Sequence, residues 1–482
     1  MSLQYQPLLQ QNAFIDGEWY RPAHLDRFPV LNPYDQTEII QVLDCGPEET
    51  RLAIEKAHAA FPSWSQRLAG ERSALLQKWH ELILRHIDDL AYLMSWEQGK
   101  PLAESRGEVQ YGASFIEWFA EEGKRIYGDV IPPHRSNTRI ITIKQPIGVV
   151  AAITPWNFPN AMICRKVAPA LAAGCTVVIK PSEETPLSAL ALAQLAQEAG
   201  FPAGVINVIP TTQAQAVGEE ICANPKVRKL SFTGSTPVGK LLMKQCADTV
   251  KKLSLELGGN APFIVFEDAD IAAAVKGAIA AKYRNTGQTC ISANRIYVQA
   301  SVYERFVEAF REAVQKLNIG NGLSPNVQIG PLINQKAMDK VERLLQDATE
   351  GGAQIILGGN KISEAIIEPT ILTEVKPEMD LHQEEIFGPI SPIYRFETEA
   401  EVIQLANDTP YGLAAYFYGT HYAQIWRVAE ALEYGMLGIN TGAISTAVAP
   451  FGGVKESGIG REGSKYGIEA FLEVKYMCWG EI

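Results

Sequence analysis

Several common signatures are missing from this chain. Its longest apolar runs, residues 147–153 and 168–173 among them, fall well short of the ~20 residues of a membrane-spanning helix. Its 43 lysines and arginines are outnumbered by 55 aspartates and glutamates, and the net charge of -12 argues against binding to nucleic acid or an anionic membrane. The first residues lack the charged and apolar segments of a signal peptide. We therefore expect a cytoplasmic protein.

Cysteine pairs with metal-ligand spacing are also missing. The seven cysteines show no CxxC pattern, which suits reduced thiols in a cytosol and predicts no metal site. At 482 residues, with 46% hydrophobic residues, the chain can bury a large core and exceeds the size of one ordinary domain.

The remaining pattern is that of an α/β protein. Short strands are expected in residues 14–45 and helices in residues 47–124, before apolar strands alternate with helices from residue 147 to residue 257. This alternation predicts a doubly wound parallel sheet, and a second α/β unit follows. Residues 138–144 alternate like an exposed strand, which the tail at 470–477 could pair with. We expect a subunit contact there; an edge strand covered by its own chain is the alternative.

No GxGxxG motif follows the first strand of the parallel sheet. Instead, residues 232–239 (FTGSTPVG) follow a later strand and open a helix, where backbone N–H groups favour a phosphate. Glycines at such a turn are often only steric. Lys180 and Glu183 follow a neighbouring strand and should share the same crevice, since ligands bind at the carboxyl ends of parallel strands.

A carboxylate and a thiol stand out further along the chain. Glu256 ends an alternating apolar strand, and a buried acid requires either a partner or a function. Cys290 lies between Gly287 and the next strand, in a turn that can expose a thiol, although most cysteines are simply buried. Asn157, between aromatic residues and prolines, has an amide that could stabilise an oxyanion or merely cap a helix. No histidine is close to Cys290 in sequence. A distant histidine could still approach it in the fold, but the motif evidence favours Glu256 as the base.

Seven motifs in order, spanning nearly the whole chain, resemble the aldehyde dehydrogenase superfamily. They occupy residues 154–159 (TPWNFP), 180–182 (KPS), 232–236 (FTGST), 256–260 (ELGGN), 287–290 (GQTC), 385–389 (EIFGP) and 450–453 (PFGG). Residues 115–128 and 461–467 resemble its succinate-semialdehyde dehydrogenase branch. The resemblance implies a cofactor domain over residues 1–126 and 147–257, a catalytic domain over 258–446, and an oligomerisation arm from 127–146 and 468–482. A homodimer or homotetramer is expected.

The resemblance also implies roles for single residues. Cys290 would attack the aldehyde, Asn157 and the Cys290 N–H would hold the oxyanion, and Glu256 would activate the water that hydrolyses the thioester. The cofactor would be NAD, with NADP possible. Its expected contacts are Ile153, Thr154, Pro155, Trp156, Lys180, Ser182, Glu183, Gly234, Ser235, Gly239, Leu257, Glu385 and Phe387. The expected substrate contacts are Arg165, Arg284, Ser445, Phe158 and Phe451.

These roles imply a CoA-independent oxidation of succinate semialdehyde to succinate. Two guanidinium groups suit an acidic tail, although either arginine could instead pair with a structural acid. Glutarate semialdehyde or another aldehyde is the nearest alternative, because one methylene is worth only ~1–3 kcal/mol in a pocket. A non-catalytic relative and a cofactor-free cysteine hydrolase are further alternatives.

Two positions refine the expectation. Glu183 can accept a hydrogen bond from a ribose 2′-hydroxyl but would repel a 2′-phosphate, so NAD is expected to be preferred over NADP, with Lys180 softening the effect. Ser292 stands two residues after Cys290, where some relatives carry a second cysteine. A local disulfide switch is therefore not expected.

Overall fold

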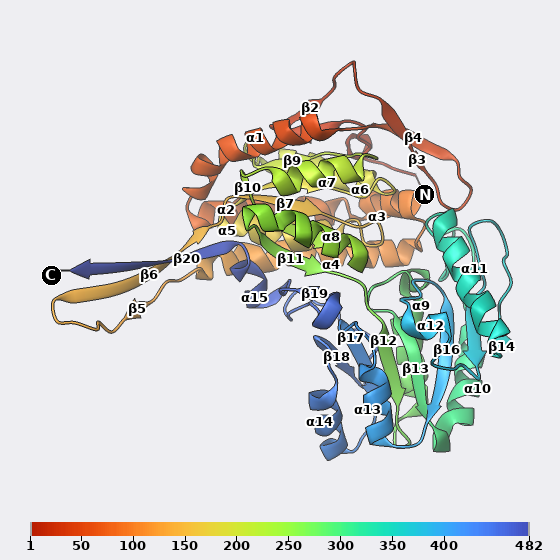
Figure 1. The fold of residues 1–482 in the computed structure, drawn as a ribbon. Helices are drawn as coiled ribbons and strands as arrows, with labels where there is room; N and C mark the ends of the chain where they lie inside the picture. The colour runs from red at the N-terminus through yellow and green to blue at the C-terminus, as the bar shows by residue number, and fades with distance from the viewer. Residues whose placement is uncertain (1, 481–482) are drawn as a thin grey trace.

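The computed structural model describes residues 2–480. Two α/β units lie beside each other, and a long three-stranded β-arm projects from the first of them (Figure 1). This confirms the α/β fold with an arm that the sequence predicts. Within residues 2–480, no helix combines the length and the apolar character needed to cross a membrane.

The first unit is built on an eight-stranded sheet whose five central strands are parallel. These strands are buried on both faces: Val150 and Ala152 pack into one core, and Val149 and Ala151 pack into the other. That explains their continuous apolar sequence. The strand order is β19 (Gly458–Ile459), β11 (Lys252–Glu256), β10 (Val227–Thr233), β7 (Val149–Ile153), β8 (Thr176–Lys180), β9 (Ile206–Val208), β1 (Ala13–Ile15), β2 (Glu18–Tyr20).

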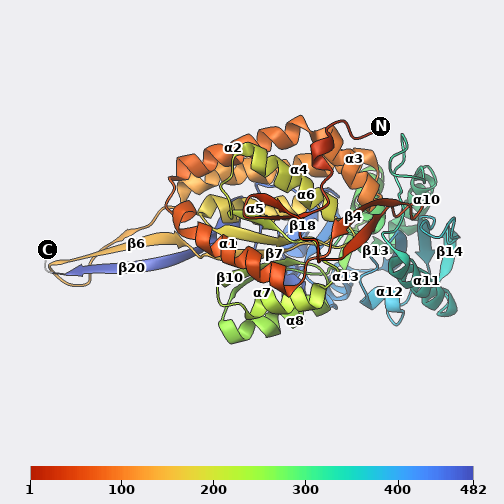
Figure 2. The same ribbon diagram turned by 90° about the horizontal axis from the view of Figure 1, so that it is seen from above.

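Helices cover both faces of this sheet. One face packs against α2 (Ala69–Arg85), α3 (Ile87–Gln98), α4 (Leu102–Glu122), α5 (Ala161–Ala173) and α6 (Pro186–Ala199). The other packs against α1 (Pro47–Ser65), α7 (Ala214–Ala223) and α8 (Thr236–Cys246). From above, α2 and α4 lie on one side of the sheet and α7 and α8 on the other (Figure 2). The doubly wound arrangement follows.

The second unit has a seven-stranded sheet. All of its neighbouring strands pair in parallel except β14, which is antiparallel at the edge. Its order is β14 (Gln354–Leu357), β15 (Thr370–Thr373), β16 (Ile390–Phe396), β13 (Ala293–Gln299), β12 (Ala261–Val265), β17 (Ala414–Tyr418), β18 (Met436–Ile439). Its helices are α9 (Ile271–Tyr283), α10 (Tyr303–Val314), α11 (Gln335–Glu350), α12 (Asp380–Gln383), α13 (Glu399–Asn407) and α14 (Tyr422–Ala431).

Sequence patterning did not predict β15, β16 or β17. Four-residue β15 is too short for a period to show, and β16 contains a serine and a proline within its apolar run. Two further strands, β3 (Arg27–Leu31) and β4 (Glu38–Leu43), lie in the region where short strands were expected and pair as a separate hairpin.

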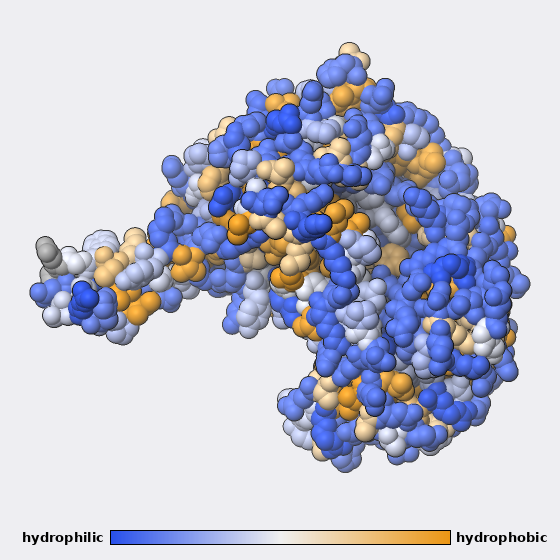
Figure 3. Space-filling view, viewed as in Figure 1, coloured by the Kyte–Doolittle hydropathy of each residue, from blue (hydrophilic) through white to orange (hydrophobic). Residues whose placement is uncertain are grey.

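The arm pairs distant parts of the chain. β6 (Thr138–Pro146) pairs antiparallel with β20 (Leu472–Gly480) along its length, as the sequence suggested, and with the short β5 (Val130–Ile131). A small helix, α15 (Ser464–Glu469), precedes β20. The arm extends from the rest of the surface (Figure 3). Its exposed large hydrophobic side chains include Val474, Tyr476 and Trp479.

Candidate active site

A cavity of about 280 Å³ lies where the carboxyl ends of β7, β10 and β11 face the turns that precede β13 and β16. It brings together most of the residues that the sequence singled out, from both units. Those lining it are Pro155, Trp156, Asn157, Phe158, Arg165, Gly234, Ser235, Leu257, Arg284, Cys290, Glu385, Phe387, Ser445 and Phe451. Those outside its lining are Ile153, Thr154, Lys180, Ser182, Glu183, Gly239 and Glu256.

Cys290 is carried by a tight turn. Three successive residues before it, Asn285, Thr286 and Gly287, have positive φ values of 52°, 57° and 77°. This backbone is costly for Asn285 and Thr286, and such conformations persist only where surrounding contacts enforce them. The thiol is half-buried, and burial raises its pKa to about 12, although the nearby charge of Arg165 opposes the rise. A thiol with a raised pKa is a poor nucleophile until a base removes its proton.

Asn157 lies in the loop after β7, directly against that turn. Its Nδ2 donates to the Gln288 carbonyl oxygen at 3.2 Å, which leaves one N–H of the amide for the cavity. Its side chain does not cap α5: the Glu108 carboxylate accepts from the first N–H groups there, Asn160 N at 3.0 Å and Ala161 N at 3.1 Å. The helix-cap alternative for Asn157 is therefore wrong.

Glu256 ends β11, and it is almost fully buried just behind the cavity wall. Its Oε2 has no hydrogen-bond partner among the described residues. A Cβ built on Gly452 would lie 3.0 Å from Oε1, so the glycine lets backbone pack against the carboxylate. Burial and the charge of Glu462 raise the pKa of Glu256. An acid with a raised pKa can act as a base near neutrality.

Three buried charged groups stand behind Glu256. Neighbouring Arg165 and Lys166 on α5 both pair with Glu462, and the Lys166 Nζ to Oε1 distance is 2.6 Å. Burial works against ionisation of Glu462, but these two cations keep its pKa below the usual value. Arg165 therefore does pair with a structural acid, as the alternative held. Its Nη2 has no partner among the described residues, and its side chain lines the cavity.

The expected substrate residues converge on one side of the cavity. Arg284 Nη1 lies 3.5 Å from the Ser445 hydroxyl oxygen, and its guanidinium carbon is 5.1 Å from the centre of the Phe158 ring. The Arg165 guanidinium carbon is 4.1 Å from the centre of the Phe451 ring. Two cations beside aromatic rings suit a short chain with an anionic end.

The expected cofactor residues divide into two groups. Trp156 and Phe387 stack edge to face, with centroids 5.5 Å apart, near Glu385. The Glu385 Oε1 accepts the Gly259 N–H at 3.0 Å, and burial raises the pKa of this acid to about 7. Lys180 and Glu183 lie outside the cavity and pair with each other at 3.2 Å. Gly239 has a packing role, because its backbone lies against Leu257.

Comparison with known proteins decides the family. The family model "Aldehyde dehydrogenase family" matches residues 19–477. The chain belongs to the aldehyde dehydrogenase family. It is similar to succinate-semialdehyde dehydrogenase (NADP(+)) GabD of Escherichia coli, at 58% identity over 100% of both chains. It is also similar to glutarate-semialdehyde dehydrogenase of Pseudomonas putida, at 58% identity over 99% of both. The solved structure of an Escherichia coli NADP dependent enzyme has a TM-score of 0.98 and 57% identity, covering 99% of this chain and 100% of that one.

These names confirm the predicted family and branch. Two of them contain NADP. The preference for NAD that Glu183 suggested therefore finds no support among the relatives of this aldehyde dehydrogenase. The structure places the Lys180 ammonium 3.2 Å from the Glu183 carboxylate, where it weakens the repulsion of a 2′-phosphate, as the sequence suggested.

Some lining residues of this aldehyde dehydrogenase were missed by sequence reasoning. Tyr111 reaches the cavity from α4 and Lys340 from α11, where Nζ donates to the Glu385 carbonyl oxygen at 2.5 Å. Both occupy helices with ordinary periodicity, so nothing local marks them. Glu462 was also missed, although it follows Arg461 in a stretch that resembles the branch.

Proposed function

We propose that this aldehyde dehydrogenase oxidises succinate semialdehyde to succinate, with NAD(P) and without CoA. The supporting observation is the pair of arginines, Arg165 and Arg284, which line the same cavity as Cys290 together with Ser445. A carboxylate tail bound by two guanidinium groups would place the aldehyde carbon toward the thiol.

The proposed reaction begins at Cys290. Glu256, acting directly or through water, takes the thiol proton, and the sulfur adds to the aldehyde carbon. The free N–H of Asn157 and the Cys290 backbone N–H hold the resulting oxyanion, and losing one such donor typically lowers the rate by ~10²–10³-fold. A dinucleotide bound by the residues named below would be the oxidant, because it can accept the hydride that leaves the adduct carbon. Glu256 passes the thiol proton to solvent and then, again as a carboxylate, activates the water that releases succinate from the Cys290 thioester.

The crevice suits a dinucleotide. Thr154 and Thr233, at the ends of β7 and β10, have buried hydroxyl oxygens without hydrogen-bond partners in the described chain. Ser235 occupies the N-cap position of α8 without a capping hydrogen bond from its side chain, and backbone N–H groups there favour a phosphate. We assign Lys180, Ser182 and Glu183 to the adenine ribose. The remaining proposed contacts are Ile153, Pro155, Trp156, Gly234, Gly239, Leu257, Glu385 and Phe387. We include NADP as a cofactor because the names of two similar proteins contain it.

The division of labour and the assembly are part of the proposal. Residues 1–126 and 147–257 would bind the cofactor and residues 258–446 would carry the catalytic thiol. The arm, with Tyr476 and Trp479 exposed, would join subunits into a homodimer or homotetramer. Light scattering and sedimentation of the whole chain measure this state.

A second substrate is favoured by a specific observation. Glutarate semialdehyde is one methylene longer, and a protein named for it is as similar to this chain as the first relative. Formation of reduced dinucleotide should be measured across ω-carboxylated, aliphatic, aromatic and betaine aldehydes. The highest kcat/KM should be for succinate semialdehyde. An uncharged aldehyde giving the highest value would contradict the proposal.

The arginine assignment has its own test. Arg284→Ala should raise the KM for succinate semialdehyde about 10- to 100-fold, because a hydrogen bond to a charged group contributes ~1.5–3 kcal/mol. The KM for butanal should stay within about two-fold. Arg311→Ala, at an exposed site on α10, is the matched control. An unchanged KM for succinate semialdehyde removes Arg284 from substrate binding.

A further inference from the structure

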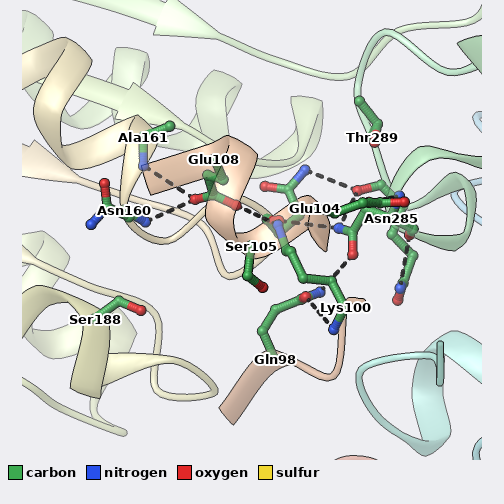
Figure 4. A network of polar contacts seen from close by, with 12 residues as sticks. Gln98, Lys100, Glu104, Ser105, Glu108, Asn160, Ala161, Ser188, Asn285 and Thr289 are labelled. Carbon is green, nitrogen blue, oxygen red and sulfur yellow. Dashed lines mark hydrogen bonds and ion pairs between the residues drawn. The ribbon is translucent and has the colours of Figure 1, made fainter. Parts of the chain in front are cut away.

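One short segment contacts both halves of the proposed reaction site. Residues 98–108 run from the end of α3 into α4, in the first unit. Their polar side chains reach the loop of Asn157 and the turn of Cys290 through a continuous set of hydrogen bonds (Figure 4). None of these residues has a place in the reaction described above.

Lys100 holds the Asn157 side of the site. It is almost fully buried, pairs with Glu108, and donates from Nζ to the Asn157 carbonyl oxygen at 2.6 Å. Glu108 in turn accepts from the first N–H groups of α5. Burial lowers the pKa of Lys100, but the Glu108 charge opposes this effect. Lys100 thus ties the backbone of the proposed oxyanion donor to α4.

Glu104 and Gln98 hold the Cys290 side. Glu104 Oε2 accepts the Asn285 N–H at 2.7 Å, and Gln98 Nε2 donates to Asn285 Oδ1 at 3.1 Å. Asn285 is the first of the left-handed residues in the turn. Its Nδ2 also donates to the Asn157 carbonyl oxygen at 3.1 Å, so the two halves meet at this asparagine.

These contacts explain how the turn keeps a costly backbone. A non-glycine residue in the left-handed region costs of order 1–3 kcal/mol and persists where neighbours over-determine it. Glu104 satisfies the N–H of that residue from a different element, while burial raises the pKa of this acid to about 7. A displacement of the turn by even ~1 Å would change the distance between the thiol and the aldehyde, and such a change typically lowers the rate ~10²-fold.

We propose that Glu104 is a positioning residue for the reaction: by fixing Asn285 it aligns the Cys290 thiol with the Asn157 amide. The inference rests on the proposed roles of Cys290 and Asn157. A purely structural role for Glu104 predicts a different result. Replacing Glu104 would then lower stability and leave the kcat of the folded molecules unchanged.

The test compares variants at one position. Glu104→Met keeps the size but removes the acceptor, and should lower kcat about 10- to 100-fold with succinate semialdehyde and with butanal alike. The KM for the dinucleotide should stay within about two-fold, because its proposed contacts lie on other elements. Glu104→Gln keeps an acceptor oxygen and should recover kcat to within about three-fold of the unmodified chain. The rate at which iodoacetamide alkylates Cys290 should change in Glu104→Met and stay the same in Glu104→Gln.

Ser105→Ala is the matched control. Ser105 is fully buried next to Glu104, and its hydroxyl bonds the Ser95 hydroxyl at 2.8 Å instead of Asn285. The Ser105→Ala variant should have a lower melting temperature and an unchanged kcat. Where Glu104→Met does not fold, Gln98→Leu replaces it and should lower kcat about three- to ten-fold with the same pattern.

The outcomes separate the two proposals. A kcat of Glu104→Met within about two-fold of the unmodified chain, no recovery in Glu104→Gln, or an equal loss in Ser105→Ala overturns the positioning role. Loss with succinate semialdehyde alone overturns it too, because only Arg284 would then have been displaced. Failure of the proposed function shows elsewhere: the unmodified chain would not oxidise the aldehyde, or Cys290→Ala would stay active.

Discussion

Replacing Glu183 by glutamine should shift the choice of cofactor. Glu183 pairs with Lys180 at 3.2 Å, and its side chain is 45% exposed. Two unit charges at ~4 Å interact by about 1 kcal/mol in water and about 4 kcal/mol near a protein surface. The exposure favours the lower figure. A 2′-phosphate carries about -1.5 to -2 charges, so the repulsion removed is about 2 kcal/mol.

That energy corresponds to about 10- to 30-fold in kcat/KM. Glu183→Gln should raise kcat/KM for NADP by this factor and change the value for NAD little, because an amide oxygen still accepts from a ribose hydroxyl. Lys180→Met should lower kcat/KM for NADP. The assay is initial rates with both dinucleotides at saturating aldehyde, repeated at high salt, where screening should shrink the effect.

Glu219→Gln, an exposed carboxylate on α7, controls for net charge. The reasoning is refuted by an unchanged ratio of the NADP and NAD values, or by equal changes with both cofactors. Either result would place the 2′-position away from Glu183.

Two other predictions concern the buried charges. The proposed base Glu256 must be ionised, and burial and Glu462 raise its pKa, so kcat should fall as pH drops through a value above the ~4.3 of an ordinary glutamate. A kcat that stays flat down to that value would exclude Glu256 as the base. Lys166→Met leaves Glu462 half-paired and should cost about 3–5 kcal/mol in urea unfolding. Lys144→Met, which breaks an exposed pair with Glu469, should cost less than ~1 kcal/mol, and equal losses would show that burial is not the cause.

The sequence anticipated the residues that lie at strand ends. Parallel strands bring their carboxyl ends to one edge, so Asn157, Ser235 and Leu257 could be placed together from their positions after three strands. Cys290 could be placed from the glycine and the strand on either side of it. Local spacing and one rule of sheet geometry are enough for such residues.

The charged surroundings of the site could not be predicted in this way. Glu462 meets Lys166 across 296 residues, and Glu104 meets Asn285 across 181. No local period links such pairs, and a charged residue on a helix is usually exposed. The NAD preference is not supported by the names of the relatives, and the sequence could not show that Lys180 pairs with Glu183 at 3.2 Å.

The two long strands of the arm, β6 and β20, are synthesised at very different times. Lys144 of β6 pairs with Glu469, beside β20, at a separation of 325 residues, and β20 covers β6 over its whole length. On the ribosome, β6 would emerge long before its partner, leaving an unpaired edge exposed during most of translation. Such edges recruit other chains. Synthesis of the last strand would both finish the arm and end the period in which a nascent chain is most open to wrong pairing.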